Sequence, residues 1–191
     1  MRKLLMAAAA IMLLMTLSVQ TTSCSKETDT MEIVINLDSI VIKPYVKFGA
    51  PLADVKAYMA QNFADYPEEH PDSLEYIVLD GGGLWSKYYM KEDRWMSFFF
   101  TDAEGKDLTM VSYDFFFPIQ IEAVMAELER NGFTNKGEVE FENDNSDLSF
   151  LFLSPDESIE AMPFYWEKDG GSWAITFQPT NDFDLQHLVN Q

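Results

Sequence analysis

The chain has 191 residues, of which 47% are hydrophobic and 14% aromatic, and it carries 32 acidic against 13 basic side chains. This composition excludes a disordered or collagen-like chain, because enough apolar surface is present to form a core. A formal charge of −19 disfavours nucleic acid as a partner, since phosphate contacts dominate that affinity. One cysteine cannot form an intrachain disulfide, and with two histidines we expect no zinc site and no other cofactor.

Residues 1–23 have the pattern of an export signal. Arg2 and Lys3 precede an apolar run over residues 4–19, which matches the length of a signal h-region and is short for a membrane span. The only cysteine, Cys24, follows this run after a few small residues. We therefore expect the signal to be removed during export.

The sequence Thr21-Thr22-Ser23-Cys24 resembles the lipobox of bacterial lipoproteins, and the resemblance covers about the first 24 residues. It implies that Cys24 is acylated, becomes the mature N-terminus and anchors the protein to a membrane. Residues 24–32 then form a polar tether. The implied location is the cell envelope, as an outer-membrane lipoprotein on the periplasmic face or at the cell surface. An ordinary unpaired thiol is the alternative for Cys24.

The first half of the mature chain predicts one helix followed by four strands. After a short strand-like stretch over 32–42, Pro51 suits a first helical turn, and apolar residues recur at helical spacing from Leu52 to Phe63. An acidic, proline-containing loop follows at 66–72. Strand-like runs separated by turn residues then occupy 74–79, 84–90, 95–101 and 108–114.

The second half repeats this order. Pro118 opens a helix whose apolar stripe runs from Ile121 to Leu128, and Asn131-Gly132 supplies its stop. Strand-like runs follow at 138–142, 148–153, 161–167 and 172–178. An offset of 69 pairs Leu52 with Ile121, and an offset of 66 pairs Phe98 with Phe164. Chance similarity between two amphipathic units is the alternative to a true repeat.

We therefore expect an α+β fold of two tandem helix-plus-antiparallel-sheet modules, each with a helix and then about four strands. The modules span 33–114 and 115–191. The alternative is that residues 33–191 form one domain. This element order resembles the tandem layout of beta-lactamase-inhibitor-protein-like domains of small exported bacterial proteins. The resemblance spans most of 44–179 and rests on element order, so it implies a fold and no functional residue.

Runs of adjacent aromatic residues are the most unusual feature. Neighbouring strand residues point to opposite faces, so a run such as Phe98-Phe99-Phe100 cannot enter one core completely. We expect an outward aromatic binding face where lysine and arginine alternate with aromatic residues, since charged neighbours indicate a wet face. The candidates are Trp85, Tyr88, Tyr89 and Trp95, interleaved with Lys87, Lys91 and Arg94. Complete coverage of both sheet faces is the alternative.

Nine acids and no base lie between Lys136 and Lys168. Glu138, Glu140 and Glu142 alternate as on one strand face, but the spacing lacks the glycine and terminal glutamate of an EF-hand, so a solvated acidic face is favoured over calcium. No catalytic motif is present, and among 32 acids paired carboxylates are unavoidable and single out no hydrolase site. We expect neither a metal site nor enzyme activity.

The sequence thus predicts a lipid-anchored cell-envelope protein with a non-catalytic, protein-binding or inhibitor-like domain. A glycan-binding accessory lipoprotein and a carboxylate-dependent hydrolase are the two alternatives. The expected partners are the membrane, through the N-terminal lipid, and a protein or a glycan.

Overall fold

The computed structural model describes residues 40–79, 82–140, 146–167 and 171–180, all within one compact unit, Ile35–Gln191. These residues form two helices and eight strands, in the order of one helix and then four strands, twice. The helices are α2 (Leu52–Asn62) and α3 (Ile121–Arg130). The strands are β1 (Glu75–Leu79), β2 (Gly82–Lys91), β3 (Arg94–Phe100), β4 (Leu108–Phe115), β5 (Thr134–Glu138), β6 (Leu148–Leu153), β7 (Ile159–Trp166) and β8 (Ser172–Pro179). Neither described helix is long and apolar enough to cross a membrane.

All eight strands form one antiparallel sheet in the order β1-β2-β3-β4-β8-β7-β6-β5. β4 pairs with β8 at its centre, so that Val111 lies opposite Phe177 and Phe115 opposite Trp173. The prediction of an α+β fold with two helix-plus-sheet modules is therefore wrong, because the protein is mainly β with one continuous sheet. Each half alone would leave the backbone groups of an inner edge unpaired, and the β4–β8 pairing satisfies them.

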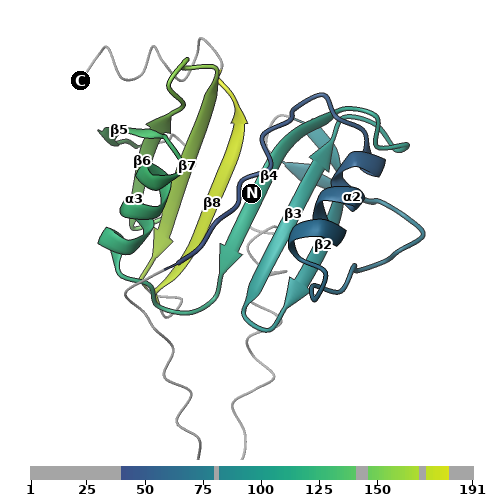
Figure 1. Cartoon of the computed structure of the whole chain (residues 1–191), viewed down its shortest axis with the longest axis horizontal. Helices are drawn as coiled ribbons and strands as arrows, with labels where there is room; N and C mark the ends of the chain where they lie inside the picture. Colours follow the sequence, from purple (N-terminus) through teal and green to yellow (C-terminus); the bar gives the residue numbers. More distant parts are fainter. Residues whose placement is uncertain (1–39, 80–81, 141–145, 168–170, 181–191) are drawn as a thin grey trace, which may run out of the picture. The chain divides into compact units, whose positions relative to one another are not determined.

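Both helices lie on the same face of the sheet, which we call the helix face (Figure 1). α2 buries Val55 and Met59, and α3 buries Val124 and Leu128, in one hydrophobic cluster with strand residues from both halves of the chain. Pro51 stands immediately before α2, as predicted. α3 begins three residues after Pro118 and ends before Gly132, whose φ of 90° suits glycine at a helix stop.

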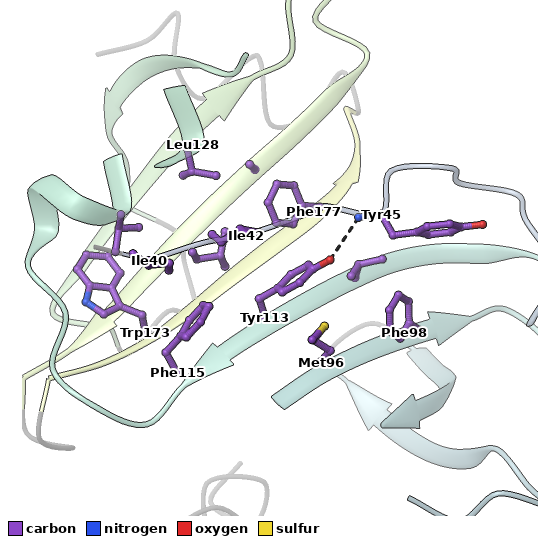
Figure 2. Packing of buried hydrophobic residues seen from close by; sticks show 14 of the residues in the cluster. Ile40, Ile42, Tyr45, Met96, Phe98, Tyr113, Phe115, Leu128, Trp173 and Phe177 are labelled. Carbon is purple, nitrogen blue, oxygen red and sulfur yellow. Dashed lines mark hydrogen bonds between the residues drawn. The ribbon is translucent and has the colours of Figure 1, made fainter. Parts of the chain in front are cut away.

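Residues 40–48 run along the helix face over the central strands β4 and β8 (Figure 1). They form no strand, contrary to the prediction for Ile40–Ile42, whereas residues 32–39 lie outside the described ranges. Ile40 and Ile42 are 7% and 3% exposed and belong to the same cluster as Trp173 (Figure 2). This segment therefore fills the space between the packed halves.

Hydrogen bonds from buried side chains fix the 40–48 segment. Glu127, on α3, accepts a bond from the Ile42 N–H at 2.7 Å. Tyr113, on β4, accepts one from the Tyr45 N–H at 3.3 Å (Figure 2) and also donates to the Lys43 carbonyl at 2.7 Å. The segment is therefore held by both a helix and the sheet.

Side chains alternate between the two faces of every strand. Phe98 and Phe100 are fully buried on the helix face, and Phe99 between them points to the opposite face, as predicted for adjacent aromatics. We call this opposite face the second face. Its apolar cluster consists of Val139, Leu151, Leu153, Met162 and Phe164, and neither helix contributes to it. The predicted strand at 138–142 is β5 instead, four residues earlier, and Val139 after it turns into this cluster.

Candidate functional site

The four aromatic residues expected to form one binding face divide between the two faces. Trp85 and Tyr89 point to the helix face, where Tyr89 is 4% exposed and its ring meets Phe98 edge-on at 5.8 Å. Tyr88 and Trp95 point to the second face and are both partly accessible. The two second-face residues are diagonal neighbours across β2 and β3, at a backbone separation of about 7–8 Å.

The argument from charged neighbours is wrong for Lys87. This side chain is 1% exposed on the helix face. Its ammonium donates to the carbonyls of His70 at 2.7 Å and Ser73 at 2.6 Å, and it lies 3.1 Å from the carboxylate of Glu68. Because two hydrogen bonds and an ion pair hold its ammonium, Lys87 clamps the 67–73 loop to the sheet and does not mark a wet face.

The second face carries two adjacent cross-strand rows of side chains. One row, which we call the Asp114 row, crosses six strands and contains Met90, Trp95, Asp114, Ala174, Phe164 and Ser149. The neighbouring hydroxyl row contains Tyr88, Ser97, Ser112, Thr176 and Met162. Where β4 meets β8, the rows contain the polar Asp114, Ser112 and Thr176. Trp95 and Phe164 lie on either side of Asp114 and Ala174, and the Asp114 row ends at Ser149.

Asp114 is the charged group at the centre of this surface. Its side chain is partly accessible, yet burial of its carboxyl raises the pKa of Asp114 to about 6, against the opposing effect of the hydrogen bond that Ser112 donates at 3.0 Å. Burial also raises the pKa of Tyr88, with smaller contributions from the charges of Glu75 and Asp114. A cation or hydrogen-bond donor brought by a partner would stabilise the ionised form of Asp114.

Aromatic pairs flank the polar centre on both sides. Trp95 on β3 meets Phe116 in a T-shaped contact with ring centroids 4.9 Å apart, and Phe116 is 39% exposed. On β7, Phe164 and Trp166 stack at 6.2 Å with their planes 27° apart. These rings are exposed or partly accessible, whereas the shorter Ser97 and Ser112 on β3 and β4 are buried. Aromatic rings around a desolvated polar centre are typical of binding hot spots.

Sequence reasoning did not single out Asp114, Ser97, Ser112 or Thr176. A usable signal was present in β4, where Ser112 and Asp114 alternate with the buried Val111, Tyr113 and Phe115. Polar residues at every second position of a strand indicate that its other face is not part of the main core. The alignment of these residues with Trp95 and Thr176 depends on strand pairing, which the alternation does not reveal.

The described residues contain no group of three or more His, Cys, Asp or Glu side chains that could hold a metal ion. Glu138 and Glu140 of the acidic stretch are exposed, and Glu142 with the turn after it lies outside the described ranges. Cys24, the signal and the tether lie outside these ranges as well.

The chain matches no protein-family model, no curated protein and no solved structure. The candidate site therefore rests on the geometry of the second face alone.

Proposed function

We propose that this chain is a lipid-anchored envelope protein that binds another protein non-covalently through the second face of its sheet. The observation that carries the proposal is the Asp114 row, in which a carboxyl with a raised pKa lies between partly accessible aromatic residues on a face to which neither described helix contributes. Acylation at Cys24 would place this face in the cell envelope, on the periplasmic side or at the cell surface.

The chemistry of the surface favours a protein partner with an apolar patch and a basic residue near its middle. Trp95 and Phe164 offer ring area on either side of Asp114. Ring burial supplies most of the affinity in such interfaces, and a desolvated charge pair at the centre fixes the register. A lysine or arginine of the partner placed against Asp114 would lower the pKa of the carboxyl. The affinity of the complex would therefore increase as the pH rises and Asp114 becomes ionised.

A carboxylate-dependent hydrolase finds little support on these strands. Glycoside hydrolysis uses two carboxyl groups about 5–9.5 Å apart. By strand register, the backbone of Glu160, another second-face carboxylate, lies about 16 Å from that of Asp114. The strands therefore bring no second carboxylate of this kind to the centre of the surface.

Co-purification of the full-length protein from its own envelope, in mild detergent, tests the proposal. A stoichiometric protein that is retained by wild type and by Glu129→Ala, but lost with Trp95→Ala, is expected. Glu129 is the control because it is exposed on α3, away from the second face. Equal retention by all three would contradict the proposal. If no protein is retained, but wild type binds a glycan on an array and Trp95→Ala does not, the result would instead support the glycan alternative.

A further inference from the structure

The two edges of the sheet differ in how well they are protected. β5 at one edge is polar, has a register shift between Asn135 and Gly137, and carries Lys136 paired with Glu157 at 2.9 Å. Bulges and edge lysines are the usual means by which a sheet prevents pairing with another strand. The β5 edge is therefore protected against pairing with a further strand.

β1 at the other edge has none of these features. Its sequence is Glu-Tyr-Ile-Val-Leu, and it pairs with β2 in regular register from Glu75 to Leu79. Tyr76 and Val78 are 56% and 58% exposed, although both are large apolar side chains. Within the described ranges, no backbone hydrogen bond joins β1 to anything other than β2. A regular, apolar, unpaired edge of this kind is a template for a further strand.

The neighbouring structure holds this edge in place. Beyond the N-terminal end of β1, the 67–73 loop covers the outer side of β2. The Glu69 N–H donates to the Tyr88 carbonyl at 2.9 Å, and the Met90 N–H donates to the Pro67 carbonyl at 3.1 Å. The Lys87 ammonium also holds this loop, through its hydrogen bonds to the His70 and Ser73 carbonyls. The Tyr76 ring lies over Gly83, where a Cβ would come within 1.9 Å of its hydroxyl, and contacts the Trp85 ring at 5.1 Å. The free side of β1 is thus preorganised.

Charge decides between the possible occupants. Residues 66–79 contain four carboxylates and no lysine or arginine, and the whole chain carries a formal charge of −19. Glu68 is paired with Lys56 and Lys87, and Glu75 lies 2.9 Å from the His70 ring, whereas no cationic side chain of the described residues is paired with Glu69 or Asp72. A second copy would carry the same large negative charge, which opposes self-pairing. A strand with lysine or arginine at its ends would meet these carboxylates favourably.

We infer that the free edge of β1 binds an extended, basic-flanked peptide segment of a partner protein as a ninth strand. Main-chain hydrogen bonds to β1 supply the affinity. Alternate apolar side chains of the peptide lie beside Tyr76 and Val78, and its terminal cations lie near Glu75 and Asp72. This surface is separate from the Asp114 row.

Three synthetic probes test the inference against the full chain in detergent. The first alternates valine and threonine over six residues between lysine pairs, the second has glutamates in place of the lysines, and the third is the lysine probe with alternate backbone nitrogens methylated. Fluorescence anisotropy measures binding, and hydrogen exchange measures protection of the β1 amides. The lysine probe should bind saturably, with exchange at β1 slowed at least tenfold, and both other probes should bind at least tenfold more weakly.

Variants of the protein locate the binding. Val78→Lys should weaken the lysine probe at least tenfold, whereas Val78→Thr, Trp95→Ala and the opposite-edge control Thr134→Lys should leave it unchanged. All replaced edge side chains are exposed, and an unchanged melting temperature confirms the fold. No saturable binding, equal binding of the methylated or glutamate probe, or equal binding by Val78→Lys would overturn the inference. So would a concentration-dependent dimer that Val78→Lys abolishes, because the occupant would then be a second copy.

Discussion

Trp95 and Asp114 lie directly opposite each other on β3 and β4, on the face of the sheet away from both helices. A large ring beside a partly desolvated carboxyl is unfavourable for the isolated protein, since burial of the carboxyl disfavours its ionised form. A partner that supplies a cation and covers the ring would remove this penalty. The pair thus links the fold to the proposed binding function.

Stability should fall with rising pH because of Asp114. Its folded pKa of about 6 is above the ordinary aspartate value of 3.8, so the folded state binds the proton more tightly. The stabilising effect of this proton is complete below pH 4 and is lost as the pH rises to about 6. Asp114→Asn should therefore raise the free energy of unfolding at pH 7.5 by about 1–2 kcal/mol, with little change at pH 4. Urea titrations at both values measure this, and Asp54→Asn, on the surface of α2, is the control. A uniform effect at both pH values would contradict the assignment.

Removal of the Glu127 carboxylate should release the 40–48 segment. Glu127 is 3% exposed, accepts the Ile42 N–H and pairs with Arg130. Glu127→Ala leaves a buried N–H unsatisfied and should cost about 1–3 kcal/mol. Glu129→Ala on the same helix, at an exposed position, should change stability by less than about 0.5 kcal/mol. Equal melting temperatures for the two variants would mean that the segment is not held by Glu127.

Lys87→Met should loosen the 67–73 loop. The substitution leaves two carbonyls without their donor and removes the buried partner of Glu68, for an expected loss of about 2–4 kcal/mol. Hydrogen exchange should accelerate at the loop amides before it does so in β4 and β8. The control, Lys106→Met, removes an exposed pair with Glu104 and should have almost no effect. A smaller loss for Lys87→Met than for the control would refute the clamp.

Adjacent aromatic residues at the end of β4 should respond differently to truncation. Phe115 is 5% exposed in the main core, and Phe115→Ala should cost about 3–5 kcal/mol. Phe116 is 39% exposed and contacts Trp95, so Phe116→Ala should cost about 1 kcal/mol or less. Denaturant unfolding of both variants measures the difference. Similar losses would show that the two rings are buried to the same extent.

The sequence predicts much of the local structure of this fold but not the pairing of strands that are far apart in the chain. Helical spacing and Pro51 place α2, and turn residues separate the strands, because these signals act between near neighbours. The pairing of β4 with β8 joins residues such as Val111 and Phe177, which are far apart in the chain, and no local pattern specifies it. For this reason the single sheet was not anticipated.

The binding surface was only half predictable for a related reason. Alternation in β4 places Ser112 and Asp114 on one face, but only the strand register brings Trp95 and Thr176 beside them. The charge of Lys87 predicted an exposed face, whereas the side chain is buried. Its ammonium donates to loop carbonyls that are distant from it in sequence. Side-chain type alone could not distinguish this buried lysine from an exposed one.

Site-specific photocrosslinking in living cells tests the central claim most directly. The full-length protein would carry p-benzoylphenylalanine at Met110, on the second face, or at Ala57, an exposed position of α2. The account predicts a discrete protein adduct from Met110 that disappears when Trp95→Ala or Asp114→Asn is added, and no such adduct from Ala57. Adducts of the same size and yield from both positions, or an adduct from Ala57 alone, would contradict it.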